Sequence, residues 1–442
     1  MKVIKPKLHD LVESGASRTV AVLRTMGVEP EERQVSIGVT LPTVDDSPRR
    51  LVAEALIDML LRLDPLVGAV VIDEPGFDSG PFLDDLAARV PLEHESRRSV
   101  PDYWVSIGSM SSSSDLIVDG GGWLAAIGDQ IDGRADKNPV GPLAAACFAA
   151  AEVFKWAFHE CWPQSADARQ LEPWRGVFSL YSYNLDRLSP AISTVPIDAS
   201  LVGCGGVGAG FVRTIAALGP QVSGSLNLID EDDLTTHNLN RVSYGTVAGA
   251  LTHSRKVDEA AAFLRARCPN LMVSPYPITF DSYKRRTPRR QDRVYDVIVT
   301  GLDGDEARWE VQRDIPRILI DGATGRDLNA RVERVEFGQY GCLGCTRQMS
   351  SVRANGEVNC DDPPDPMAPS LSFLSAFPGI LAAGELIKEV MRSGQLRGRF
   401  DHVFRYGPNP DMRATDATRV DCRAGCQRAS KLAQYRAKYP GN

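Results

Sequence analysis

The pattern of apolar and polar positions in the first part of the chain predicts alternating helices and strands. Residues 51–63 place apolar side chains at helical spacing, and the apolar runs at 67–72 and 116–119 are typical of buried strands. This alternation favours an α/β layer with a parallel sheet. We therefore predict an α/β domain over residues 1–165, without a legible nucleotide loop.

The second part of the chain repeats the alternation. A strand at 200–202, a helix at 207–218 and a strand at 226–229 predict a βαβ opening. Further strands are predicted at 294–300, 317–320 and 328–337, before a long apolar helix at 374–391. We predict a second Rossmann-like domain at 199–427, with a doubly wound and mostly parallel sheet.

Prolines and chain length define the rest of the organisation. Prolines at 163, 173, 190 and 196 accompany a loss of periodicity, which predicts a linker at 166–198. A chain of 442 residues exceeds the usual size of one hydrophobic core, in agreement with two domains. Residues 428–442 are predicted to be a C-terminal tail.

Composition narrows the class of protein. Hydrophobic residues make up 43% and charged residues 24% of the chain, with a formal net charge of -7, which favours a globular protein and does not indicate a general nucleic-acid surface. No apolar run reaches the roughly 18 residues of a membrane span, and the opening segment lacks the apolar stretch of a secretory signal. We expect a cytoplasmic protein that binds neither membrane nor nucleic acid.

One glycine-rich segment has the composition of a phosphate-binding loop. Gly203, Gly205 and Gly208 fit G-x-G-x-x-G between a predicted strand and helix, and Asp230 closes the next strand. Glycines let backbone amides approach anionic oxygens, and the helix start adds positive potential. The glycines at 120–122 lack such a frame, so a tight strand-to-helix turn is predicted there.

The residues that follow favour nucleotide chemistry over hydride transfer. Asp230 to Asp232 are followed by Asn238 to Arg241, by Lys256 and by Asp303. Attack of a carboxylate on an α-phosphate builds up negative charge that Arg and Lys stabilise, while an aspartate can hold Mg²⁺. A dehydrogenase does not need these groups.

The strings GCGGVG, LIDEDDLTTHNLNR and TGLDGDEAR, with Lys256 and two cysteine pairs, resemble the MoeB, ThiF and ubiquitin-activating superfamily. The resemblance covers roughly residues 195–427. It implies an adenylation domain with ATP and Mg²⁺, in which Arg241, Lys256 and Asp303 act on the phosphates and Asp303 lies near the magnesium. The implied ATP-binding set is Gly203, Gly205, Gly206, Gly208, Asp230, Asp232, Asn238, Arg241, Lys256 and Asp303.

Four cysteines have the spacing of a structural metal site. Cys342 and Cys345 form C-x-x-C, and Cys422 and Cys426 form C-x-x-x-C, which together provide the four thiolates of a closed Zn²⁺ site. Relatives in the superfamily usually carry C-x-x-C as the second pair. We predict a zinc-stapled hairpin that holds the C-terminal segment.

Cys360 is a candidate nucleophile in a polar stretch before the helix at 374–391. In ThiF-like and ubiquitin-activating relatives a cysteine in this loop takes the acyl group from the adenylate, so the resemblance implies a thioester on Cys360. Asp361 and Asp362 oppose thiolate formation by like-charge repulsion, and MoeB-type relatives adenylate without a thioester.

One family feature has no direct match. Relatives place an arginine-bearing motif before the first strand of this domain, and the nearest string here is YSYNLDR, residues 181–187. Tyr183 and Asn184 fit the motif, but the arginines do not align. We expect either Arg187 or a group from the first domain to supply this charge.

The resemblance implies ATP-dependent activation of the C-terminal glycine of a ubiquitin-like protein and transfer to a conjugating enzyme. The first 165 residues resemble the inactive adenylation half fused in ubiquitin-activating enzymes, and the architecture is similar to that of bacterial ubiquitin-like conjugation systems, some associated with phage defence. A homodimer stays open. The alternatives are a sulfur-carrier activator for molybdopterin or thiamine synthesis, an NAD-binding oxidoreductase and an inactive scaffold.

Overall fold

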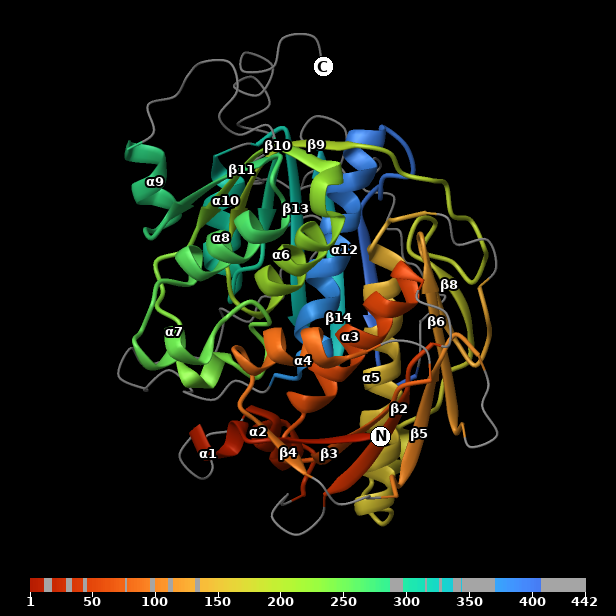
Figure 1. Cartoon of the computed structure of the whole chain (residues 1–442). Coiled ribbons are helices and arrows are strands. Elements are labelled where there is room, and N and C mark those ends of the chain that lie inside the picture. Colours follow the sequence, from red (N-terminus) through yellow and green to blue (C-terminus); the bar gives the residue numbers. More distant parts are fainter. Residues whose placement is uncertain are drawn as a thin grey trace.

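Two β-sheets with flanking helices make up the protein (Figure 1). The computed structural model describes residues 1–11, 18–28, 34–42, 46–75, 78–95, 100–109, 114–131, 136–286, 297–314, 316–325, 328–336, 343 and 370–406. The prediction of a mixed α/β fold with two Rossmann-like sheets is confirmed.

The first sheet has eight strands, and its four central strands are parallel. The order across the sheet is β4 (Leu92–Glu95), β1 (Lys2–Pro6), β3 (Val67–Asp73), β2 (Val35–Thr40), β5 (Tyr103–Ile107), β6 (Leu116–Gly121), β7 (Leu124–Ile127) and β8 (Gly176–Ser179). Its helices are α1 (Leu8–Leu11), α2 (Arg18–Thr25), α3 (Ser47–Leu61), α4 (Gly80–Ala87) and α5 (Val140–Cys161).

The second sheet has seven strands, and the five from β11 to β13 are parallel. The order is β11 (Leu271–Tyr276), β10 (Val222–Ile229), β9 (Val195–Val202), β12 (Val297–Thr300), β13 (Ile318–Gly325), β14 (Asn329–Glu336) and β15 (Arg399–Val403). Its helices are α6 (Gly206–Leu218), α7 (Val247–Leu251), α8 (Lys256–Arg267), α9 (Phe280–Arg286), α10 (Asp305–Arg313) and α12 (Ser372–Met391).

The two sheets share one topology. The first contains the strand order β3-β2-β5-β6-β7-β8, and the second contains β10-β9-β12-β13-β14-β15, with parallel and antiparallel pairings in the same places. In each, the last strand is preceded by a long helix, α5 or α12. The chain is therefore an internal duplication, in which α3 corresponds to α6 and α5 to α12.

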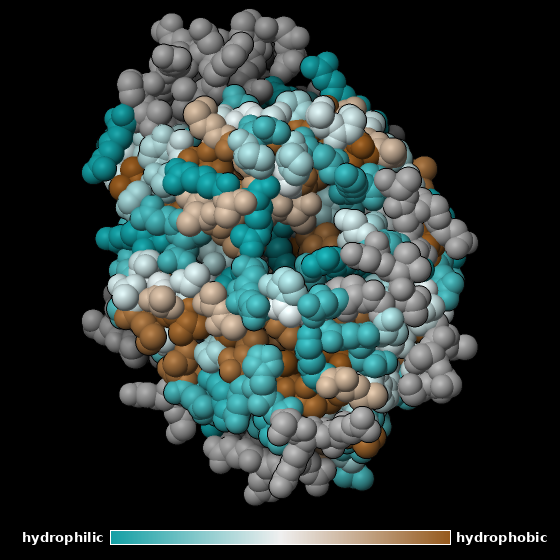
Figure 2. Space-filling view, viewed as in Figure 1, coloured by the Kyte–Doolittle hydropathy of each residue, from teal (hydrophilic) through white to brown (hydrophobic). Residues whose placement is uncertain are grey.

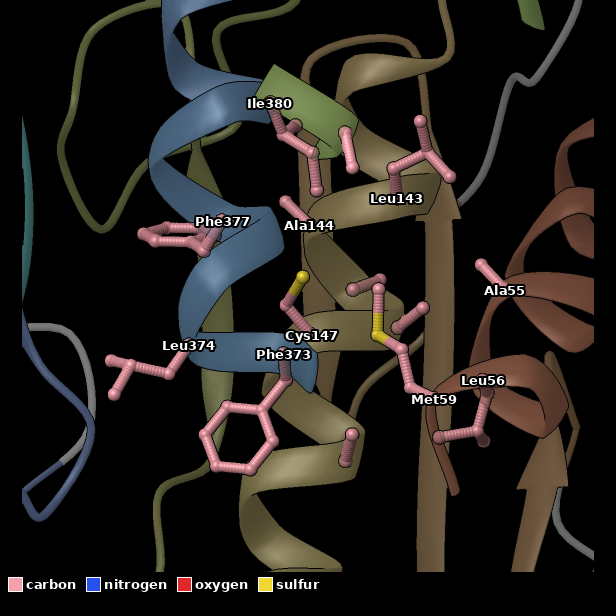
Figure 3. Close-up of a cluster of buried hydrophobic side chains, with 14 of the residues drawn as sticks. Ala55, Leu56, Met59, Leu143, Ala144, Cys147, Phe373, Leu374, Phe377 and Ile380 are labelled. Carbon is pink, nitrogen blue, oxygen red and sulfur yellow. The ribbon is translucent and has the colours of Figure 1, made fainter. Parts of the chain in front are cut away.

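Helices of the two repeats pack against each other in a continuous core. Figure 3 shows Cys147 and Ala144 of α5 between Met59 of α3 on one side and Phe373 and Phe377 of α12 on the other. Burial of this apolar surface stabilises the contact between the repeats. Helix α5 is long and apolar enough to span a membrane, but 94% of its apolar window is buried inside the protein, as in a core helix.

The repeats also meet at the surface. Figure 2 shows hydrophobic residues gathered in the lower half of the displayed face, in the region that α4 and α7 occupy in Figure 1. The backbone N–H of Val247 in α7 donates to the carbonyl of Ala88 beyond α4 over 2.9 Å. The guanidinium Nη2 of Arg267 in α8 donates to the carboxylate of Asp85 in α4 over 3.0 Å. The interface between the repeats thus extends from the core to this face.

Two local predictions differ from the structure. The glycines at 120–122 do not form a strand-to-helix turn; they belong to a β-hairpin between β6 and β7, with Gly122 at a φ of 58°. A side chain at Gly120 would press on the Cα of Pro142 in α5 at 2.6 Å, so glycine is needed for this helix to lie on the hairpin. Part of the predicted linker, Gly176–Ser179, forms β8 of the first sheet.

Candidate functional site

A cavity of about 360 Å³ opens at the carboxyl ends of β9, β10 and β12. In parallel α/β sheets this edge, where the strand order reverses, is the usual ligand position. The cavity brings together six residues predicted from the sequence and an apolar wall. The lining residues are Val202, Gly203, Gly205, Ile229, Asp230, Glu231, Asp232, Lys256, Ile278, Thr279, Phe280, Gly301, Leu302, Asp303, Ala307, Glu310 and Val311.

The glycine loop ends β9 and begins α6. Gly203 has a φ of 91°, and a side chain there would lie 2.7 Å from the carbonyl oxygen of Gly301, so only glycine suits the turn. Gly205 is the N-cap of α6 and has no side chain to bond the first amides of the helix. A Cβ at Gly205 would meet open space within 4 Å. Unoccupied amides at a helix start form a site for anionic oxygens.

Asp230 braces this loop from the end of β10. Its carboxylate accepts hydrogen bonds from the backbone N–H of Cys204 over 2.6 Å and of Asp232 over 2.9 Å. Burial raises the pKa of Asp230, and the positive charge of Lys256 acts in the opposite direction. Asp230 therefore supports the loop and also faces the cavity.

Lys256 supplies the positive charge of the cavity floor. It begins α8, is only 10% exposed at its side chain, and its Nζ lies 2.7 Å from Oδ2 of the more exposed Asp232. The backbone N–H of Lys256 donates to the carbonyl of Asp232 over 3.1 Å, which fixes the start of the helix. A buried lysine held by a solvent-exposed aspartate is suited to exchange that partner for a phosphate oxygen.

Arg241 lies against the start of α6. A Cβ at Gly206 would come within 3.1 Å of the Arg241 side chain, and the guanidinium donates to the carbonyl of His237 over 2.9 Å. Burial, with a further contribution from the charge of Arg18, lowers the pKa of Arg241 to about 10, so that it stays protonated at neutral pH. The charge of Asp303 acts on it in the opposite direction.

Arg18 is the candidate that the first repeat offers for the unmatched arginine, and its contact with a nucleotide stays a prediction. It is the first residue of α2, in the first repeat, yet its charge acts on Arg241 at the glycine loop of the second repeat. Arg187, the other candidate, is half-exposed and pairs with Asp129 of the first repeat over 2.8 Å. Tyr183 of the same string is buried, and its hydroxyl donates to Glu385 of α12 over 2.6 Å.

Asp303 follows β12 and is exposed in the cavity. Among the described residues its carboxylate has no hydrogen bond or ion pair and lines the cavity, so its oxygens are accessible to a cation such as Mg²⁺. Asn238 instead accepts the backbone N–H of Thr235 over 3.0 Å as part of a capping box. Its contact with phosphates stays a prediction.

Two supporting residues were not singled out from the sequence. Arg308 of α10 donates to the carbonyl of Leu302, and its Nε lies 3.1 Å from Oδ1 of the fully buried Asp321. The same Asp321 oxygen accepts the hydroxyl of Thr300 over 2.6 Å. Together they hold the turn that carries Asp303. The available signals were an aspartate directly after the apolar run 317–320 and the arginine that ends TGLDGDEAR.

The cysteine predictions are not tested. Cys342, Cys345, Cys360, Cys422 and Cys426 all lie outside the described residues. Within the described part of the chain, no three His, Cys, Asp or Glu side chains are grouped to hold a metal. The zinc site and the thioester on Cys360 stay predictions.

The helix of the first repeat that corresponds to α6, which is α3, begins with a side-chain cap. Asp46 caps α3 by accepting the N–H of Arg49 over 3.2 Å. The guanidinium of Arg49 bonds the buried Asp119 over 3.3 Å and the carbonyl of Gly108 over 3.1 Å. The first turn of α3 is therefore capped by a side chain, whereas the first turn of α6 at Gly205 is not.

Comparisons with known proteins agree with the second repeat as the site-bearing part. The model of the ThiF family matches residues 197–417, from β9 through α12 and β15. The uncharacterized protein y4jF of Sinorhizobium fredii (strain NBRC 101917 / NGR234) is 27% identical over 311 residues, which are 68% of this chain and 57% of y4jF. The chain thus spans less than two thirds of the length of that relative.

Solved structures similar to this chain include two of E. coli MccB. The structure of MccB with ATP has a TM-score of 0.39 and 16% identity, and the match covers 65% of this chain and 91% of MccB. The structure of MccB with MccA-N7isoASN has a TM-score of 0.38 and 18% identity, with 47% and 60% covered. Since the family model matches 221 of the 442 residues (197 to 417), the chain belongs to the ThiF family.

Proposed function

We propose that this protein uses ATP to adenylate the C-terminal carboxylate of a ubiquitin-like protein. The observation that carries the proposal is the combination, in one cavity, of an uncapped helix start, Lys256 and the accessible carboxylate of Asp303. A dinucleotide-binding oxidoreductase needs the glycine loop but does not need Lys256 and Asp303 beside it. Membership of the ThiF family supports the same choice.

The residues around the cavity would have separate roles in nucleotide binding and in charge stabilisation. The amides at the start of α6 would hold phosphate oxygens, and Asp230 would bond the ribose. The apolar wall, which includes Ile278, Phe280 and Val311, is suited to the base. Asp303 would bind Mg²⁺, whose charge reduces repulsion between the phosphates and the incoming carboxylate.

The proposed reaction forms one bond and breaks one. A carboxylate oxygen of the partner attacks the α-phosphorus of ATP, and the bond from that phosphorus to the bridging oxygen of pyrophosphate breaks. Negative charge grows on the α-phosphate and on the leaving pyrophosphate, where Arg241, Lys256 and Arg18 provide positive charge. The acyl group would then pass from AMP to the thiolate of Cys360, and from there to a conjugating enzyme.

The duplicated topology supports a role for the first repeat in this scheme. Its own helix α3 is capped by Asp46, while the charge of its Arg18 acts on Arg241 of the second repeat. We infer that the first repeat takes the place of a second subunit and completes the nucleotide site. A further association of two chains stays a prediction, as does a role in phage defence.

The test is ATP–pyrophosphate exchange with candidate ubiquitin-like proteins. Asp303→Ala and Arg241→Ala should each reduce exchange by at least about a hundredfold, since each removes a group that acts on the phosphates. Arg187→Ala, which removes an exposed guanidinium bound to Asp129, is the matched control and should exchange at the wild-type rate. Full exchange in both site variants would refute the assignment.

A gel-shift assay tests whether the acyl group is transferred from AMP to Cys360. A band that is lost on thiol reduction and absent from Cys360→Ala would support the thioester and a conjugation pathway. Pyrophosphate release without such a band would favour activation of a sulfur carrier. Protection by NADH and none by ATP would favour an oxidoreductase.

A further inference from the structure

A buried ion cluster joins the first repeat to the nucleotide site of the second. It consists of Asp58 and Arg62 of the α3 region and Arg213 of α6. The side chains of Asp58 and Arg62 are 2% and 1% exposed, and Arg62 Nε lies 2.7 Å from Asp58 Oδ1. The other carboxylate oxygen of Asp58 bonds Arg213, from the helix whose start faces the cavity.

The cluster is an unusual feature in otherwise apolar surroundings. Asp58 lies on α3 among buried Ala55, Leu56 and Met59, the side chains that pack on α5 in Figure 3. Burial by itself would raise the pKa of Asp58, but the charges of Arg62 and Arg213 outweigh it and hold the pKa below its ordinary value. Buried charges of this kind add little net stability compared with apolar residues, so their presence calls for another role.

Arg62 contacts both the segment that carries Arg241 and the segment that carries Arg18. Its Nη1 donates to the carbonyl of Leu239, which lies in the turn that carries Arg241. Its own carbonyl accepts the hydroxyl of Thr19 over 3.5 Å, and Thr19 follows Arg18 in α2. Both Leu239 and Thr19 are fully buried, so these bonds are not exchanged with water.

We propose that Arg62 is a positioning residue for the nucleotide site: anchored by Asp58, it fixes the turn that carries Arg241 and the helix start that carries Arg18. Arg213 of α6 bonds the same carboxylate of Asp58. The inference rests on the proposed nucleotide site, because only a bound phosphate would require the two arginines and α6 to keep one arrangement. Small displacements of such groups reduce function strongly.

A lysine at position 62 separates positioning from a purely structural role. Lysine retains a positive charge for Asp58, but it lacks the planar fork that lets one side chain bond Asp58 and the Leu239 carbonyl together. Arg62→Lys keeps a charge for Asp58 and should lower the melting temperature less than Arg62→Met does, yet it should bind MgATP about tenfold more weakly than the wild type. Arg62→Met should lose both stability and affinity.

The measurement is the dissociation constant of MgATP for the full chain by titration calorimetry, with the melting temperature of each variant. Lys155→Met is the matched control: it breaks a buried pair with Glu152, 2.5 Å away on α5, and within the described part of the chain neither partner bonds a residue that lines the cavity. We expect this control to melt lower and to bind MgATP as the wild type does.

The outcomes separate this inference from the proposed function. Wild-type affinity in Arg62→Lys, or an equal loss of affinity in Lys155→Met, would overturn the positioning role. A wild-type protein that binds MgATP but exchanges no pyrophosphate with any partner would refute adenylation. The MgATP affinities of the variants would then still test the positioning role of Arg62. No binding of MgATP by the wild type would refute both.

Discussion

Replacement of His402 by phenylalanine should reduce the loss of folding stability that occurs as the pH is lowered below neutral. His402 lies on β15 with no exposed surface, and its ring centroid is 4.3 Å from that of Phe404 and 5.3 Å from that of Phe377. Among the residues that the structure describes, neither ring nitrogen has a hydrogen-bond partner. Burial, with a smaller effect of Lys155, lowers the pKa of His402 to about 3.

The sign and size of the effect follow from proton linkage. The unfolded chain binds a proton at His402 near pH 6.5, whereas the folded protein does not until about pH 3. The stabilising contribution is therefore present above pH 6.5 and is lost as the pH falls between these values. At about 1.4 kcal/mol per pKa unit, the loss between pH 7.5 and pH 4.5 is roughly 2.5 kcal/mol.

The assay is urea-induced unfolding at pH 7.5, 6.0 and 4.5, followed by circular dichroism. His402→Phe keeps an aromatic ring in the cluster, and any packing change it causes is the same at every pH. The free energy of unfolding of the variant minus that of the wild type should be about 2.5 kcal/mol more positive at pH 4.5 than at pH 7.5. His159→Gln, on the exposed end of α5, is the control. Parallel pH profiles for wild type and His402→Phe would refute the reasoning.

Three other substitutions test the site and its support. Gly208→Ala places a Cβ against the carbonyl oxygen of Gly203, so kcat/KM for pyrophosphate exchange should fall at least tenfold, more than for Ala209→Ser on the same helix. Lys256→Met removes the charge that opposes the raised pKa of Asp230, so Asp230 should become protonated at a higher pH than in the wild type. As the pH is lowered, MgATP affinity should therefore begin to fall at a higher pH in the variant. The same pH dependence of affinity in both proteins would contradict this. Tyr183→Phe deletes the 2.6 Å bond to buried Glu385 and should reduce stability by about 1–3 kcal/mol, measured by urea unfolding, without a change in MgATP affinity.

The internal duplication gives a reason for the presence of the first repeat. Arg49 of α3 bonds Asp119 within the first repeat, whereas Arg62, directly after α3, bonds the carbonyl of Leu239 in the second repeat, and the charge of Arg18 in α2 acts on Arg241. In the proposed function, the second repeat carries the nucleotide-binding loop and the first repeat contributes positive charge to it. Removal of the first repeat is therefore expected to impair nucleotide binding as well as stability.

Local sequence patterns determined the parts of the site whose residues are close in the chain. The turn between β9 and α6 requires Gly203 and an uncapped helix start, and the aspartate at the end of β10 follows from the βαβ spacing, so these were predictable. The strands predicted at 67–72, 200–202 and 226–229 lie in β3, β9 and β10, because buried parallel strands are rich in apolar residues.

Only the tertiary structure decided which distant residues meet. The charge of Arg18 acting on Arg241, the bond from Arg62 to Leu239 and the support of Asp303 by Arg308 and Asp321 depend on how helices of two repeats pack. An arginine in a helix has the same sequence pattern whether it faces water or a buried carboxylate, since the partner lies on another element. Hydrophobic periodicity sets each element, whereas the packing of α3, α5, α6 and α12 sets the site.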